Sequence, residues 1–185
     1  LLTSLWPTLE LPADGRVLVP LCGKTRDMHL LAQWGHTVIG AELSEVAARD
    51  FFDESGQSAT IADIGRFRRY RGPAVSILVG DFFQLDAGTA GVVDAVFDRA
   101  ALIALPEDMR QAYVEHLGQL MPAGSRGLLI TVEYEPGMID GPPFLVTETE
   151  VLERFGGWAD VTRLGSAPSL VKGLECQEAA YLITR

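Results

Sequence analysis

Glu42 and Gly23 are the residues whose type and spacing first suggest chemistry. Glu42 ends the apolar run 37–41, where a carboxylate could accept hydrogen bonds from the two hydroxyls of a ribose. Gly23 lies in the turn 21–24 that follows an earlier apolar run. A pyrophosphate site would need the pattern G-x-G-x-x-G, of which only Gly23 is present. We therefore predict that this region binds a nucleoside without phosphates.

Further polar residues follow two later apolar runs. Asp81 comes after the run 75–79, and the pair Asp98 and Arg99 ends the run 94–98. The carboxyl ends of parallel strands share one edge of a sheet, and ligands of open α/β sheets bind there. We expect the residues at these strand ends to lie close together.

The elements that must position these residues alternate along the chain. Residues 16–45 read as strand, turn, helix and strand, which is one right-handed βαβ unit. Further strands are expected at 75–79, 94–98 and 127–132, with helices at 1–11, 44–56, 106–121 and 147–155. The runs 160–164 and 179–184 have no helix between them, which predicts an antiparallel pair. The sequence predicts an α/β, Rossmann-like methyltransferase sandwich in one domain over residues 1–185, with a mostly parallel seven-stranded sheet and an antiparallel C-terminal strand.

Residues 57–72 differ from the rest because four arginines gather around Phe67 and Tyr70. These are Arg66, Arg68, Arg69 and Arg71. The cluster could bind an anion or border the mouth of a substrate site. On an acidic chain we favour an irregular excursion with a solvated basic face.

Composition excludes several classes of protein. A net charge of −10 and a pI near 4.7 argue against a nucleic-acid partner, and no apolar run approaches the roughly 20 residues that span a bilayer. Cys22 and Cys176 make no disulfide framework, which favours the cytoplasm. His29, His36 and His116 lack metal-ligand spacing, so we predict no metal. We expect a cytoplasmic monomer.

Several segments together resemble the bacterial thiopurine S-methyltransferase family. They are V-L-V-P-L-C-G-K-T-R-D-M, V-I-G-A-E-L-S-E, G-D-F-F, F-D-R-A-A-L-I-A-L-P, and L-L-I-T-V-E-Y with G-P-P-F, and they occur in order over residues 11–155. The family's leading tryptophan-rich segment has no counterpart here, and Trp6 reads as a core anchor of the first helix.

The resemblance implies S-adenosylmethionine as cofactor and assigns it a set of residues. It implies contacts from the turn that holds Leu21 and Gly23, a ribose contact from Glu42, and an adenine flanked by Asp81 and Phe82. It also implies that Arg99 lies close to both cofactor and acceptor. We expect Leu21, Glu42, Asp81 and Arg99 to converge on one hollow.

The resemblance further implies direct methyl transfer to a small thiol or thiopurine-like acceptor. Alignment of the two sulfurs would supply most of the catalysis, and Arg99 would favour the thiolate form of the acceptor. Arg99 could instead form an ion pair with Asp98 or with another acid at a strand end. Alternatives to the function are methylation of selenium or tellurium oxyanions, as in tellurite resistance, or a non-catalytic nucleotide-binding protein.

Overall fold

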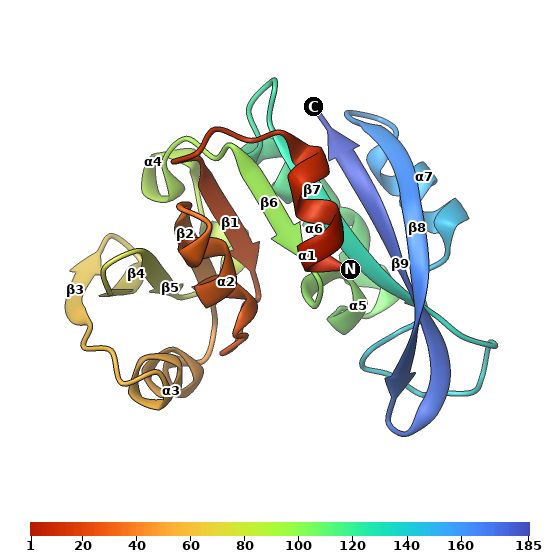
Figure 1. The fold of residues 1–185 in the computed structure, drawn as a ribbon, viewed down its shortest axis with the longest axis horizontal. Helices are drawn as coiled ribbons and strands as arrows, with labels where there is room; N and C mark the ends of the chain where they lie inside the picture. Colours follow the sequence, from red (N-terminus) through yellow and green to blue (C-terminus); the bar gives the residue numbers. More distant parts are fainter.

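A single nine-stranded sheet runs through the computed structural model, which describes residues 1–185 (Figure 1). The strand order is β3-β4-β5-β2-β1-β6-β7-β9-β8. The strands are β1 (Arg16–Pro20), β2 (Thr37–Glu42), β3 (Thr60–Ile64), β4 (Phe67–Arg71), β5 (Val75–Val79), β6 (Ala95–Asp98), β7 (Arg126–Glu133), β8 (Asp160–Val171) and β9 (Leu174–Thr184).

Helices lie on both faces of this sheet. They are α1 (Leu2–Leu5), η1 (Trp6–Leu9), α2 (Asp27–Gln33), α3 (Glu45–Glu54), η2 (Phe82–Gln84), α4 (Ala87–Ala90), α5 (Ala101–Ala104), α6 (Glu107–Leu120) and α7 (Glu148–Phe155). One apolar core packs α4 to α7 against the sheet, and a second core packs α1, η1, α2 and α3 against the other face. Coverage of both faces explains why the central strands are continuous apolar runs.

The five central strands, β5, β2, β1, β6 and β7, are parallel, as predicted. Their carboxyl ends therefore share one edge of the sheet. The Rossmann-like α/β class is confirmed, and Trp6 is buried in the second core.

The predicted count of seven strands is wrong, because residues 57–72 are not irregular. They form the hairpin β3–β4, which extends the sheet by antiparallel pairing of β4 with β5. Phe67 and Tyr70 are buried in opposite cores, while the arginines between and beyond them face outward. The sequence did not indicate β4 as a strand, because three of its five residues are arginines and only Phe67 and Tyr70 are buried.

The antiparallel pair at the C-terminus is confirmed and is longer than predicted. β9 pairs with β7 along eight residues, and β8 and β9 continue as a two-stranded arm past the end of β7 (Figure 1). The arm reaches the loop that follows β7, where Lys172 donates a hydrogen bond from Nζ to the carbonyl of Gly141 at 3.2 Å. None of the helices is both long enough and apolar enough to cross a bilayer.

Candidate active site

Glu42 ties the ends of neighbouring strands together. Its Oε2 accepts a hydrogen bond from the backbone N–H of Gly23 at 2.7 Å, and its Oε1 accepts one from Ser44 at 2.8 Å. The backbone N–H of Gly80, which follows β5, donates to the carbonyl of Glu42 at 2.9 Å. The turns after β1 and β2 therefore meet at this carboxylate, and the turn after β5 meets the backbone of the same residue. Each carboxylate oxygen keeps a lone pair for a ligand.

A hollow of about 250 Å³ lies beside the end of β1. Its lining includes Leu21, Cys22, Thr25, Asp27 and Arg99. The structure therefore brings Leu21 and Arg99 into one cavity. Glu42 and Asp81 do not line this cavity, but lie next along the same edge, joined to it through Gly23 and Gly80.

Arg99 bridges two acids from distant parts of the chain. Its Nη1 lies 3.3 Å from Asp27 Oδ2, at the start of α2, and its Nη2 lies 3.0 Å from Glu178 Oε1 in β9. Burial opposes the charge, but the hydrogen bond and charge of Glu178, then those of Asp27, outweigh it and raise the pKa of Arg99. With the bond from Nε to Glu178, three of the five N–H donors are used and two remain for a ligand.

Asp98 does not pair with Arg99 but points into the core. It accepts hydrogen bonds from the backbone N–H of Ala101 at 2.9 Å and from the Tyr113 hydroxyl at 2.7 Å. These bonds start α5 and join it to α6, so they fix the segment that carries Arg99. Burial raises the pKa of Asp98 to about 6, although the bond from Tyr113 works in the opposite direction.

This raised pKa predicts how stability changes with pH. Because the folded pKa of Asp98 is above its unfolded value, folding favours the proton, and stability falls as pH rises from about 4 to about 6. Tyr113→Phe removes a donor to the carboxylate, so the Asp98 pKa rises further. We expect this variant to lose about 1.5–3 kcal/mol at pH 7 and much less at pH 4. Urea unfolding at both pH values measures this, and an equal loss at both would contradict it.

Asp81 and Phe82 occupy the start of the segment after β5. The Asp81 carboxylate caps η2, accepting from the backbone N–H of Phe83 at 3.0 Å, and is exposed. The Phe82 ring is buried in the core, 5.1 Å from the ring of His116 and 5.4 Å from that of Tyr113. The structure therefore leaves the Asp81 side chain at the edge and places the Phe82 ring beneath it.

Cys22 and Gly40 fit together behind the Gly23 turn. Cys22 is buried and its pKa is raised well above the ordinary value, chiefly by burial and then by the charge of Glu42, so it remains a neutral thiol. A Cβ atom on Gly40, the neighbouring residue in β2, would lie 2.6 Å from Cys22 Sγ and 3.1 Å from Met28 Sδ. Because Gly40 has no side chain, the turn that holds Cys22 and Gly23 can pack directly against β2.

Gly40→Ala is therefore expected to destabilise the fold by about 1–3 kcal/mol through overpacking against Cys22. A second change, Cys22→Ala, should recover part of this loss because it removes the sulfur that collides. Gly157→Ala is the matched control, since a Cβ there meets nothing within 4 Å. Chemical denaturation measures all three, and no recovery in the double variant would contradict the packing argument.

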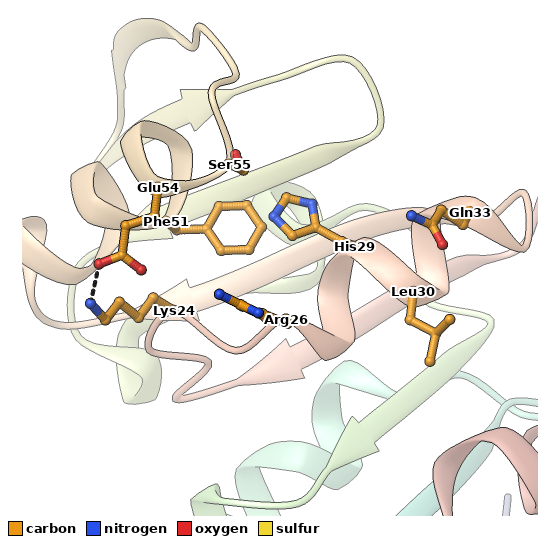
Figure 2. Close-up of a pocket in the computed structure, with 8 residues that line it drawn as sticks. All are labelled: Lys24, Arg26, His29, Leu30, Gln33, Phe51, Glu54 and Ser55. Carbon is orange, nitrogen blue, oxygen red and sulfur yellow. Dashed lines mark hydrogen bonds and ion pairs between the residues drawn. The ribbon is translucent and has the colours of Figure 1, made fainter.

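A larger hollow of about 370 Å³ lies between α2 and α3 (Figure 2). Lys24 forms an ion pair with Glu54 at one end, and the ring of His29 stacks on that of Phe51 at 4.3 Å. Lys24 is thus held by α3. None of the residues expected to bind cofactor lines this hollow.

The loop between β7 and α7 is tied to the segment that follows Arg99. Phe144 donates its backbone N–H to the carbonyl of Ile103 in α5 at 2.6 Å, and the Tyr134 hydroxyl donates to the carbonyl of Pro143 at 2.9 Å. The loop is therefore fixed to α5, which begins two residues after Arg99.

Asp27 and Glu178 are site residues that the sequence reasoning did not identify. Asp27 opens the helix after the glycine turn, and this position alone could have indicated it. Glu178 is 79 residues from Arg99, and only the pairing of β9 with β7 brings it to the edge. No three His, Cys, Asp or Glu side chains form a group that could hold a metal ion.

Comparison with known proteins decides the family. The model of the thiopurine S-methyltransferase family matches residues 1–183. The chain belongs to this family. Proteins named thiopurine S-methyltransferase from Pseudomonas syringae pv. pisi and Bordetella petrii are 44% and 46% identical to it, over 100% and 93% of the chain and 88% and 78% of their own lengths. The recognition made from the sequence motifs is confirmed.

Solved structures share the fold of this family member at lower identity. A TehB-like SAM-dependent methyltransferase from Corynebacterium glutamicum is 17% identical with a TM-score of 0.62, over 98% of this chain and 85% of that chain. Magnesium protoporphyrin IX methyltransferase from Synechocystis with bound SAM is 18% identical with a TM-score of 0.69, over 99% and 76%. The chain is a methyltransferase that uses S-adenosylmethionine, as expected.

The residues at the edge fit this cofactor. The Glu42 carboxylate has one free lone pair on each oxygen, which suits the two hydroxyls of a ribose. Three carboxylates, Glu42, Asp27 and Glu178, accompany one guanidinium, so the site carries surplus negative charge. Such a surplus suits a ligand with a sulfonium and an ammonium group.

Proposed function

We propose that this chain transfers the methyl group of S-adenosylmethionine to the sulfur of a small aromatic or heterocyclic thiol of the thiopurine type. The observation that carries the proposal is the junction at Glu42 beside the Leu21–Arg99 hollow, in a chain of the thiopurine S-methyltransferase family. The junction would hold the adenosyl part, and the hollow would hold the reacting groups.

The cofactor would supply a methyl group carried on a sulfonium. The acceptor thiolate would form a new C–S bond as the bond from the methyl carbon to the sulfonium breaks. The electron pair of the broken bond would stay on the cofactor sulfur, so that S-adenosylhomocysteine is the second product. The chain's task is alignment, because an in-line transfer needs no general base once the acceptor is ionised. Leu21 and Gly23 would position the cofactor, with Asp81 and the segment at Phe82 flanking its adenine.

Arg99 would act between cofactor and acceptor. Its two free N–H donors can reach a thiolate or a heterocyclic nitrogen, while Asp27 and Glu178 hold its side chain in place. Because Asp27 and Glu178 partly neutralise the charge of Arg99, this side chain would contribute more by orienting the acceptor than by lowering the acceptor pKa.

The test is a panel of acceptors incubated with labelled S-adenosylmethionine, with products identified by mass spectrometry. We expect S-methylated thiopurine and an equal amount of S-adenosylhomocysteine. Methylation of selenite or tellurite but of no thiol would replace the proposed acceptor with an oxyanion. Binding of cofactor without transfer to any acceptor would contradict the enzyme assignment.

We further propose that the protein acts as a cytoplasmic monomer on small molecules, without a nucleic-acid partner. Its two cysteines are free and buried, which suits a reducing compartment. The net charge of −10 would repel nucleic acid. Light scattering tests whether the protein is a monomer, and a filter-binding assay tests whether it binds nucleic acid.

A further inference from the structure

A third hollow lies at the opposite edge of the sheet from the candidate active site. It measures about 330 Å³, and its polar lining includes Arg16, Thr37, Arg69, Arg71, Ser76 and Thr89. No aspartate or glutamate lines it. Three arginines without an acid are unexpected in a chain of net charge −10.

Strand register places these side chains on one face. Arg71 pairs with Ser76, Ser76 pairs with Ile39, and Arg16 pairs with Thr37. Partners in register point to the same side of a sheet. β4 and β1 are three strand spacings apart, about 14 Å, so Arg69 and Arg71 face Arg16 across a floor of β5 and β2.

The hollow exists because the connection from β5 to β6 is short. It contains only η2 and the four-residue helix α4, which lies beside the amino end of β1 (Figure 1). No longer helix covers the face of β5 and β2 here, so Ile39 and Leu78 form an apolar floor under the arginines. A hollow of this size suits a small molecule.

The arginines are positioned but not neutralised. Arg16 donates from Nη1 to the carbonyl of Ala90 at 2.9 Å, and its guanidinium packs so closely on Gly91 that a Cβ there would lie 2.0 Å from Nη1. Arg68, which precedes Arg69 in β4 and does not line the hollow, pairs with Asp63 and Glu45. Arg69 and Arg71 make no side-chain hydrogen bond or ion pair.

Two acids bond to residues that line the hollow, but through the backbone N–H groups of those residues. Asp94 accepts the backbone N–H of Arg16 at 2.7 Å, and Asp86 caps α4 through the backbone N–H of Thr89, also at 2.7 Å. Neither carboxylate pairs with a guanidinium. The donors of Arg69 and Arg71, the remaining donors of Arg16, and the hydroxyl groups of Thr37 and Ser76 thus remain available above the hollow.

From this arrangement we propose that the hollow is a second ligand site, which binds a small phosphate-bearing molecule. Arginine forks match phosphate oxygens in pairs, and the hydroxyls of Thr37 and Ser76 add neutral donors. The arginines on two sides suit a ligand with more than one anionic group, such as a diphosphate. The surrounding acidic surface disfavours a large polyanion.

Calorimetry with inorganic pyrophosphate and with uridine 5′-diphosphate tests this site. The titrations are run at constant ionic strength, with and without excess S-adenosylhomocysteine. We expect one bound ligand per chain with a Kd below about 1 mM, unaffected by S-adenosylhomocysteine. Tighter binding of the nucleotide would identify a nucleoside phosphate as the ligand, and equal binding would identify the inorganic ion.

The variant that decides is Arg69→Gln with Arg71→Gln, which should weaken binding at least tenfold and leave methyl transfer unchanged. The matched control is Arg49→Gln with Arg66→Gln, which removes the same charge outside the hollow and should change Kd less than twofold. Circular dichroism and unfolding midpoints confirm that both variants fold. Competition by S-adenosylhomocysteine, equal losses in both variants, or no binding below about 1 mM would each overturn the proposal.

Discussion

Glu42→Ala should weaken the binding of S-adenosylhomocysteine at least 100-fold. The variant removes a charged acceptor for two ribose hydroxyls, and each such hydrogen bond is worth about 1.5–3 kcal/mol. It also releases the backbone N–H groups of Gly23 and Ser44, which the carboxylate now holds. The variant therefore loses the bonds that hold the two turns as well as the contact with the ligand. Calorimetry measures the combined effect.

Glu42→Gln separates these two contributions. The amide keeps one acceptor oxygen, so part of the affinity should return. Glu54→Ala removes a carboxylate from a half-exposed ion pair on α3 and is the matched control, with a change in Kd below twofold expected. Equal affinities in wild type and Glu42→Ala would remove Glu42 from the site.

Arg99→Met should lower kcat/KM by about 100- to 1000-fold, the range found for a donor aimed at a developing charge. The variant removes the fork between cofactor and acceptor and leaves Asp27 and Glu178 without their shared partner. The loss should fall mainly on kcat if Arg99 orients the reacting groups. Steady-state kinetics with varied acceptor measures the division between kcat and KM.

Arg99→Lys keeps the charge but loses the planar fork, so it should recover only part of the activity. Arg126→Met is the control. Arg126, like Arg99, pairs with an acid, and it also bonds to a carbonyl, but it lies at the start of β7, at the opposite edge. A kcat/KM for Arg99→Met within threefold of wild type would leave Arg99 with a structural role only.

The parallel half of the fold could be predicted because its signals are local. Each of the five central strands is an apolar run that ends at a polar residue or a glycine turn, and helix caps such as Ser44 and Thr147 mark where the next element begins. The position of Glu42 at a strand end follows from the same pattern. Its bond to the Gly23 backbone needs only the handedness of the βαβ unit.

The features that escaped prediction depend on distant pairing. β4 reads as a basic loop, because only contact with β5 and the two cores shows that Phe67 and Tyr70 are anchors of a strand. The sequence offered Asp98 as one possible partner of Arg99, but the acids that pair with Arg99 are 72 and 79 residues away. The three arginines of the third hollow come from β1 and β4, whose proximity depends on the strand order.

The central claim is that the strand ends around Glu42 and Arg99 form a site for an adenosyl ligand. Calorimetry of wild type and Glu42→Ala with S-adenosylhomocysteine and, separately, with NAD tests it most directly. We expect the wild type to bind S-adenosylhomocysteine, Glu42→Ala to lose this binding, and neither protein to bind NAD. Binding of NAD but not of S-adenosylhomocysteine by the wild type would contradict it.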